Sequence, residues 1–241
     1  MMLPSNGSSS PWPKTSNPSM GYELDFSAIT ANLGLLLEGA GLTLMLTAIA
    51  ATLGMALSIG GAAARRWGPV WAQTLVGAYV ELIRNTPFIV QLFFIFFGLP
   101  SLGIKLTALA AAALAMTINL TAYGIEIMRA GLEAVPPGQR EAGLSLGLSP
   151  LSVFVYVTLP QAVAVVYPAL VSQIIITMLE SAVVSQIAVI DLTHVADLIQ
   201  SRTYRAFETY FIVTLIYLGM ALLLRCLFNL AGQRYFAGQR G

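Results

Sequence analysis

The sequence has very few charged residues. Only 10% of its 241 residues are charged, whereas 57% are hydrophobic, and a soluble domain typically has about 25% charged residues. A compact fold of this size could not cover itself with so little polar surface, which excludes a soluble enzyme and a disordered chain. The net charge of +1 gives no field that would attract a polyanion, so no nucleic-acid partner is expected.

Two further shortages narrow the chemistry. The single cysteine, Cys226, excludes an intramolecular disulfide and a cysteine-based metal cluster. The two lysines are Lys14 and Lys105, and neither ends the G-x-x-x-x-G-K-[ST] sequence of a P-loop. We therefore expect no catalytic residue, no metal and no cofactor in this chain, and any ATP-Mg would be bound by a partner polypeptide.

Long uncharged runs dominate what is present. They cover 39–64, 85–104, 106–125, 142–179 and 209–224. A bilayer crossing needs about 20 mostly apolar helical residues, and backbone in lipid must satisfy its own hydrogen bonds, which favours helices. The runs predict an all-α integral membrane protein with five spans, at about 39–64, 82–100, 105–128, 160–180 and 207–228.

The basic residues indicate an orientation. One side would carry Arg65, Arg66, Arg129, Arg140, Arg225, Arg234 and Arg240, and the other Lys14, Lys105, Arg202 and Arg205. Because cytoplasmic loops carry the excess of Lys and Arg, the N-terminus is predicted outside and the C-terminus inside. Residues 1–22, rich in Ser, Pro and Asn, are expected to form a disordered external tail. Residues 67–83 are expected to be an amphipathic stretch at the inner interface.

The segment Val135–Pro160 reads VPPGQREAGLSLGLSPLSVFVYVTLP. It predicts a cytosolic loop, 133–158, with two short helices that meet at Ser149-Pro150, where Ser149 caps the second helix and Pro150 is its first residue. Glu141 is expected in the first turn of the first short helix. Gly143 and Gly147 are expected on one helical face, where a partner backbone could approach closely.

Three motifs in this order resemble one family. Glu141-Ala142-Gly143, Gly147 and Val157-Thr158-Leu159-Pro160 resemble the EAA loop of ABC-importer permeases, with departures at Gly143 and Val157. The other two motifs are similar to signatures of the polar amino-acid permeases, of the histidine, glutamate, glutamine, arginine and opine type. They are Glu81-Leu82-Ile83-Arg84-Asn85-Thr86-Pro87 with Gln91-Leu92-Phe93-Phe94, and Glu126, Arg129, Ala130-Gly131, Val135-Pro136 and Gly138-Gln139. The resemblance covers about 33–230.

The resemblance implies a fold, a function and partners. It implies the transmembrane domain of a type I, MetI-like ABC importer in the bacterial plasma (inner) membrane, which moves a polar amino acid inward by alternating access. The partners would be an ABC ATPase dimer, a second permease subunit (identical or homologous), an extracytoplasmic solute-binding protein, the lipid bilayer and the amino acid. The ATPase would dock on Glu141, Ala142, Gly143 and Gly147, with Pro136 and Gly138 in the same loop.

Polar side chains inside spans are costly and point to function. Two stripes have helical i, i+4, i+7 spacing: Asn119, Tyr123 and Glu126, and Gln173, Thr177 and Glu180. We expect them to line a substrate passage between two permease subunits. The alternatives are that Glu126 pairs with Arg129, and that Gln173 and Thr177 only form interhelical hydrogen bonds.

Other residues complete the expected site. Glu81 and Arg84 are three apart and could pair, and Pro87 should kink the second helix, in the segment that lies near the gate in the family. Leu179 stands where family members often carry Lys, which favours a cationic amino acid here. Residues 184–200 are expected to be helical and external, with Asp191 and Asp197 either at the binding-protein contact or simply solvated.

Two other function classes fit the sequence less well. An ion-coupled secondary transporter predicts an inverted repeat and buried carboxylates at mid-membrane, whereas no repeat is evident and the acidic residues lie near the predicted helix ends. An intramembrane hydrolase would need a nucleophile partner for the lone histidine, His194, and the sequence has no G-x-S-x-G motif.

Overall fold

The computed structural model describes residues 23–236, and all regular structure in this part of the chain is helical. The predicted external tail, 1–22, lies outside these residues. In chain order the helices are α1 (Ser27–Ala31), α2 (Leu33–Trp67), α3 (Val70–Arg84), α4 (Phe88–Phe93), the π-helix η1 (Phe94–Gly98), the 3₁₀-helix η2 (Leu99–Leu102), α5 (Ala108–Ala134), α6 (Pro137–Ser145), α7 (Pro150–Val153), the π-helix η3 (Phe154–Thr158), α8 (Leu159–Glu180), the 3₁₀-helix η4 (Ser181–Ile187), α9 (Leu192–Thr203) and α10 (Ala206–Phe236).

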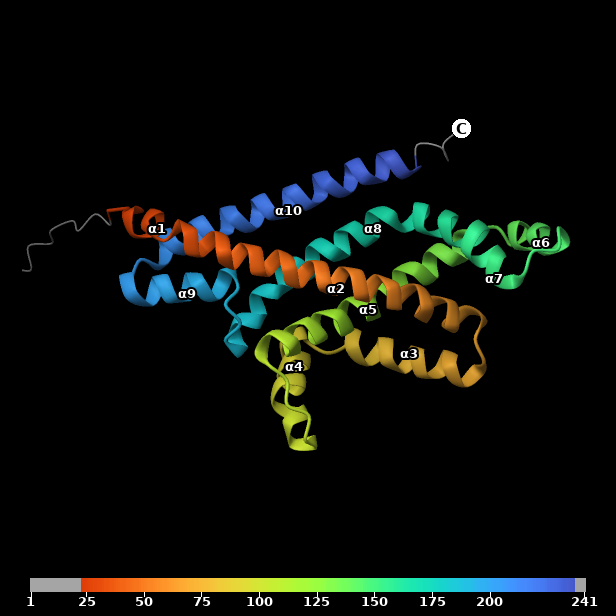
Figure 1. The fold of residues 1–241 in the computed structure, drawn as a ribbon, viewed down its shortest axis with the longest axis horizontal. Coiled ribbons are helices and arrows are strands. Elements are labelled where there is room, and N and C mark those ends of the chain that lie inside the picture. Colours follow the sequence, from red (N-terminus) through yellow and green to blue (C-terminus); the bar gives the residue numbers. More distant parts are fainter. Residues whose placement is uncertain (1–22, 237–241) are drawn as a thin grey trace, which may run out of the picture.

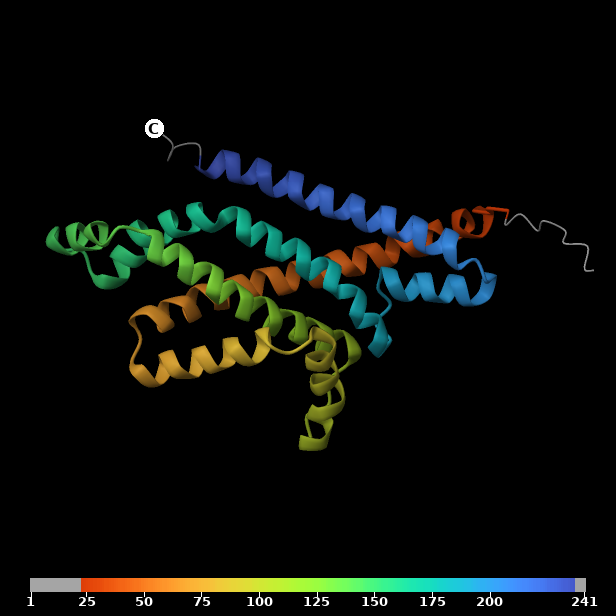
Figure 2. The ribbon, with the colours of Figure 1, turned by 180° about the vertical axis from the view of Figure 1, so that it is seen from behind.

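Four helical segments are long and apolar enough to cross a membrane: Leu33–Trp67, Ala108–Ala134, Pro150–Ile187 and Ala206–Tyr235. They contain most of the predicted first, third, fourth and fifth spans. The helices run past the predicted limits because charged residues such as Arg65 and Arg129 remain helical at the ends of the apolar runs. The start of α1 and the end of α10 lie at opposite ends of the molecule, as an odd number of crossings requires (Figures 1 and 2).

The predicted span 82–100 is not one helix. Helix α3 ends at Arg84, and Val70–Arg84 and Phe88–Leu102 are bent by 109° at the intervening residues. Pro87 has no N–H to continue the helix and disfavours helical geometry at the residue before it. The expected kink is therefore a full break, and α4 to η2 projects away from the bundle (Figures 1 and 2).

The predicted amphipathic stretch 67–83 contains α3, which packs one side against α2 and α5. Val80 and Ile83 are buried, and the hydroxyl of Tyr79 donates to the carbonyl oxygen of Ile118 on α5 over 2.6 Å. The other apolar side chains of the predicted pattern point away from the protein: Trp71, Leu75 and Leu82 are 68%, 63% and 64% exposed. The expected position at the inner membrane interface therefore stays a prediction.

Helices α2 and α5 approach each other closely along small residues. A Cβ on Gly54 would lie 3.1 Å from the Leu120 side chain, and one on Gly124 would overlap the Ser58 hydroxyl. The Ser58 hydroxyl lies 3.1 Å from the carbonyl oxygen of Thr121 on α5. Small residues of this kind let membrane helices pack backbone to backbone, so the α2–α5 pair forms the centre of the bundle that holds the other elements.

Candidate coupling loop and polar clusters

The segment between α5 and α8 forms a helical knuckle at one end of the molecule. Helices α6 and α7 extend beyond the end of α2 there (Figure 1). Ser149 is the N-cap of α7, its hydroxyl oxygen accepts a hydrogen bond from the N–H of Ser152 at 3.1 Å, and Pro150 is the first helical residue. The predicted pair of short helices and the predicted cap are confirmed.

Two details of this loop were predicted wrongly. Glu141 is the fifth residue of α6 rather than a first-turn residue, because α6 already begins at Pro137. Gly147 is not on a helical face with Gly143: it follows α6 with φ +81°. Its N–H donates to the Leu144 carbonyl at 2.9 Å, and that of Leu148 donates to the Gly143 carbonyl at 3.2 Å. These two bonds are those of a Schellman motif, which ends a helix at a left-handed glycine.

Gly143 has an internal packing role. A Cβ at this position would lie 2.9 Å from Cγ2 of Val153 on α7, so its missing side chain lets the two short helices touch. Gly143 is buried, whereas Pro136, Gly138, Glu141, Ala142 and Gly147 are exposed. The close approach at Gly143 is thus made by α7 of the same chain and not by a partner protein. The exposed residues of the loop are the ones that a partner could contact.

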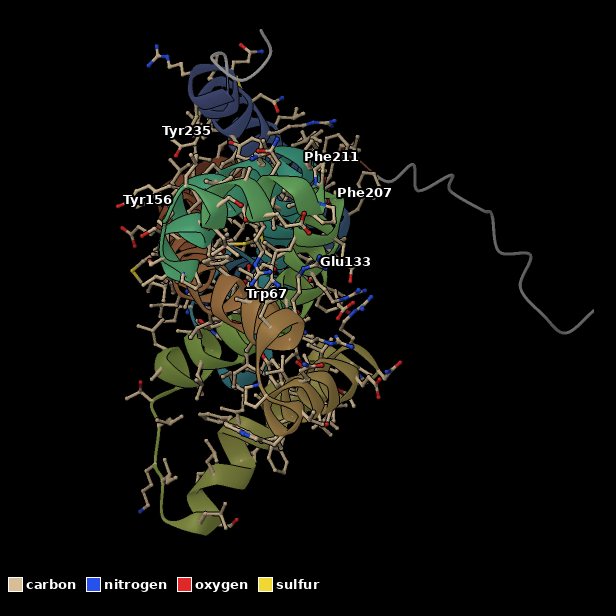
Figure 3. All side chains as sticks on the ribbon, turned by 90° about the vertical axis from the view of Figure 1, so that its right-hand side faces the viewer. Trp67, Glu133, Tyr156, Phe207, Phe211 and Tyr235 are labelled. Atoms are coloured by element: carbon tan, nitrogen blue, oxygen red, sulfur yellow. The ribbon has the colours of Figure 1, made fainter. Side chains whose placement is uncertain are left out.

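The sequence reasoning missed two apolar residues on the knuckle. Leu146 is 82% exposed and Leu151 is 71% exposed, beside the α6–α7 turn. The base of the knuckle is fixed to α2 by an edge-to-face contact between Trp67 and Phe154, with ring centroids 5.6 Å apart. Figure 3 looks onto this end of the molecule, with Trp67 near the middle and Tyr156 pointing away at the rim. Exposed leucines next to glycine and proline in a loop are the signal that could have found this surface.

Glu126 is the centre of an ion-pair cluster that joins three helices. It contacts Arg65 of α2 through Oε1 and Arg129 of α5 through Oε2, at 3.0 Å. Arg129 also pairs with Glu133 at 2.6 Å, and Arg84 of α3 lies 4.0 Å from Oε2 of Glu126. The predicted alternative of an ion pair with Arg129 is confirmed, but Glu126 has cations from α2 and α3 as well.

A cavity of about 350 Å³ adjoins this cluster and is lined by Arg65, Val80, Glu81, Arg84, Asn85, Tyr123 and Glu126. The guanidinium of Arg84 lies over the Tyr123 ring, 5.4 Å from its centroid. The predicted Glu81–Arg84 pair is absent among the described residues, because Arg84 is directed toward Tyr123 and Glu126. Tyr123 and Glu126 therefore share a face, as predicted, and that face borders a polar cavity.

Gln91 holds the break between α3 and α4. Its side-chain amide donates to the carbonyl oxygens of Ile83 and Thr86, at 2.8 and 3.0 Å, and its Oε1 accepts from Nδ2 of Asn119 at 3.1 Å. Gln91 and Asn119 are both buried. The sequence marked Gln91 only as part of a motif, since nothing in it shows that the side chain would cap the preceding helix.

The second polar stripe lies on α8. Gln173 and Thr177 are buried, and Glu180 is the partly exposed last residue of the helix. The hydroxyl of Thr177 and Oδ1 of Asn119 are buried without a hydrogen-bond partner in the described part of the chain. Buried polar atoms are nearly always bonded, so Thr177 and Asn119 are positions within the bundle at which a polar ligand would satisfy an open group. Nε of Arg66, near the end of α2, is the third buried atom of this kind in the described residues.

Asp191 is neither solvated nor at a surface contact. It is fully buried as the N-cap of α9, where it accepts a hydrogen bond from the N–H of His194 at 2.9 Å. Its backbone lies against Gly39 of α2, where a Cβ would be 2.9 Å from the Asp191 carbonyl oxygen. Burial raises the pKa of Asp191 to about 6. The predicted helix 184–200 is divided into the end of η4 and α9, and Asp191 anchors the start of α9 to α2.

Comparison with known proteins decides the family. Residues 56–236 match the model of the "binding-protein-dependent transport system inner membrane component" family. The chain is a member of this permease family. It is 34% identical to the glutamine transport system permease protein GlnP of Escherichia coli, over 84% of this chain and 93% of that protein. It is also 34% identical to the arginine transport system permease protein ArtQ of Bacillus subtilis, over 83% and 92%.

Solved structures agree with this assignment. A crystal structure of an amino acid ABC transporter with histidines matches 88% of this permease and 99% of its own chain, with 40% identity and a TM-score of 0.79. An inward-facing structure of the MetNI methionine ABC transporter, at 20% identity and a TM-score of 0.71, shows the same fold. The permease is thus a multi-pass plasma-membrane subunit of an ABC importer, as predicted. Nothing in these matches supports the ion-coupled alternative.

Proposed function

We propose that this permease moves a polar amino acid inward by alternating access. The matched relatives transport glutamine and arginine, so these are the first substrates to test. A solute-binding protein delivers the amino acid at the α9 end, the outer face in the predicted orientation, with the N-terminus outside and the C-terminus inside. An ATPase dimer supplies the energy at the opposite end, and this chain hydrolyses no ATP and holds no cofactor or metal.

The observation that carries the proposal is the α6–α7 knuckle. It extends beyond the α2 end and exposes Leu146 and Leu151 beside the turn at Gly147 that ends α6. Exposed apolar side chains clustered outside the membrane region mark a protein contact. We assign the ATPase contact to Glu141, Ala142 and Gly147 together with these leucines, with Gly143 as the residue that packs the knuckle and Pro136 and Gly138 at its base.

The passage is proposed to follow the polar faces of α5 and α8. Asn119 and Thr177 each have a buried polar atom with no partner among the described residues, and Gln173 lies one helical turn from Thr177. Tyr123 and Glu126 border the polar cavity on α5, Glu180 ends α8, and Glu81, Arg84 and Pro87 form the break that the passage would meet. A single chain of this size encloses no channel, so a second permease, identical or homologous, completes the wall.

The test is reconstitution with the ATPase and the binding protein in proteoliposomes. Glutamine or arginine should stimulate ATP hydrolysis and should enter the vesicles. A complex that recruits no ATPase, or that transports neither amino acid, would overturn the proposal. Glu141→Arg should reduce ATPase co-purification at least about tenfold, since an exposed contact residue is reversed in charge.

The matched control is Glu38→Arg, because Glu38 is also an exposed glutamate but lies on α2 near the opposite end of the molecule. It should leave the yield of ATPase unchanged. Equal loss in both variants would show that the charge reversal acts through folding or insertion, and would remove the support that this experiment gives to docking at the knuckle.

A further inference from the structure

Arg84 and Glu81 carry opposite charges, lie beside one cavity and could each still bind a charged group of a ligand. Both lie on the last turn of α3 and line the cavity of about 350 Å³. Small-molecule pockets are commonly about 300–1,000 Å³, so an amino acid fits. Glu81 has no ion pair among the described residues, and the side chain of Arg84 is 44% exposed. The two side chains face the same cavity without neutralising each other.

Arg65 and Arg129, the other two cations of the Glu126 cluster, are already paired with the Glu126 carboxylate. Oε1 of Glu126 contacts Arg65, and Oε2 contacts Arg129 at 3.0 Å. Arg84 reaches only 4.0 Å from the same carboxylate, beyond hydrogen-bond distance. Its guanidinium is instead held over Tyr123, which fixes the group while leaving its N–H donors available. Arg84 is therefore the positioned cation with spare donors.

The position of this pair suits a translocated solute. The α3–α4 junction lies well inside the two ends of α2 (Figures 1 and 2), so the pair is placed along the length of the bundle rather than at a loop. On α8 and the segments joined to it, 150–187, the sole charged residue is Glu180. A carboxylate that passes along α5 and α8 can thus find its cation on α3 but not on α8.

We propose that Arg84, Glu81 and Asn85 form a subsite for the zwitterionic head group of an α-amino acid. Arg84 binds the α-carboxylate, Glu81 binds the α-ammonium, and Asn85 provides an exposed amide at the rim. The subsite recognises what all α-amino acids share and leaves side-chain selection to other groups. The inference rests on the proposed function, because it assigns a contact to the substrate named there.

The test uses the purified permease–ATPase complex without binding protein. Binding of radiolabelled L-glutamine and L-arginine is competed by the unlabelled amino acid and by its α-amide, which lacks the carboxylate charge. The wild-type complex should prefer the free acid by about tenfold or more, as expected for a hydrogen-bonded charge pair. Arg84→Gln should remove that preference and leave the affinity for the amide unchanged, and Arg84→Lys should restore part of it.

A second variant and a control make the outcome specific. The wild-type complex should bind the free amino acid more tightly than its N-acetyl derivative, which lacks the ammonium, and Glu81→Gln should reduce this preference. This measurement can be made even if the Arg84→Gln complex does not assemble. Arg202→Gln changes an exposed arginine on α9 and should alter neither preference. If the Arg84 effect follows the content of anionic lipid rather than the carboxylate, a lipid phosphate occupies the cavity and the proposal is overturned.

The two proposals fail in different ways. If the full importer with its binding protein transports neither amino acid, the proposed function fails and the subsite fails with it. If the importer transports one of them and Arg84→Gln keeps the wild-type preference for the free acid, the subsite alone is refuted.

Discussion

Replacing Gln91 by Leu should open the break between α3 and α4. The Gln91 amide caps carbonyl groups of Ile83 and Thr86 and accepts from Asn119. A leucine of similar size fills the space but restores none of these bonds. The carbonyl of Ile83 keeps a longer contact with Thr86, at 3.3 Å from its hydroxyl, so the groups left without a partner are the Thr86 carbonyl and the Asn119 amide.

The expected loss follows from those two groups. A buried polar group that loses its partner costs about 1–3 kcal/mol, and side-chain hydrogen bonds measured inside membrane proteins lie nearer the low end. We therefore expect Gln91→Leu to lower the free energy of unfolding by about 2–4 kcal/mol. Adding Asn119→Leu removes one of the stranded groups, so the double variant should be less destabilised than the sum of the two single variants, by about 1 kcal/mol.

The assay is equilibrium unfolding of the purified permease in detergent, with hydrogen exchange followed over 83–91. Gln73→Leu is the matched control: Gln73 also donates to one backbone carbonyl, that of Gly68 at 2.9 Å, but it is exposed. It should change the unfolding free energy by less than about 0.5 kcal/mol. The reasoning is refuted if Gln91→Leu is as stable as Gln73→Leu, or if exchange at the break does not rise.

Three further predictions have matched controls. Gly147→Ala should weaken exchange protection in the knuckle by about 1–2 kcal/mol because of its positive φ, whereas Gly138→Ala, equally open in space, should not. Gly39→Ala should lower the melting temperature because its Cβ meets the Asp191 backbone, whereas Gly41→Ala meets nothing; equal melting temperatures would contradict this. The pKa of Asp191 is raised from 3.8 to about 6, so the protonated carboxyl is favoured by folding. Stability should fall as pH rises between these values, and Asp191→Asn should flatten that slope.

The sequence was sufficient to predict the first, third, fourth and fifth spans, because each depends on a local run of apolar residues, as along 39–64. It also found the Ser149 cap, which needs only neighbours in the chain. It failed where the answer lies in a distant partner. The burial of Asp191 depends on Gly39, some 150 positions earlier, and the role of Gln91 depends on where Asn119 falls after folding. The early start of α6 at Pro137 is the exception, since proline at a first helical position is a local signal.

The ion pairs made by the few charged residues also indicate which helices are held together. Glu126 of α5 is paired with Arg65 of α2, while Arg84 of α3 lies 4.0 Å from the same carboxylate. Separating α2 from α5 would break the Arg65–Glu126 pair and leave a partly buried charge without its partner. The α5–α8 contact has no ion pair among the described residues: it is apolar, with Met128 and Leu132 packed with Ala162 and Val166. For the proposed alternating access we therefore expect α2 and α5 to stay together and the α5–α8 contact to change, because α8 continues directly from the knuckle through η3.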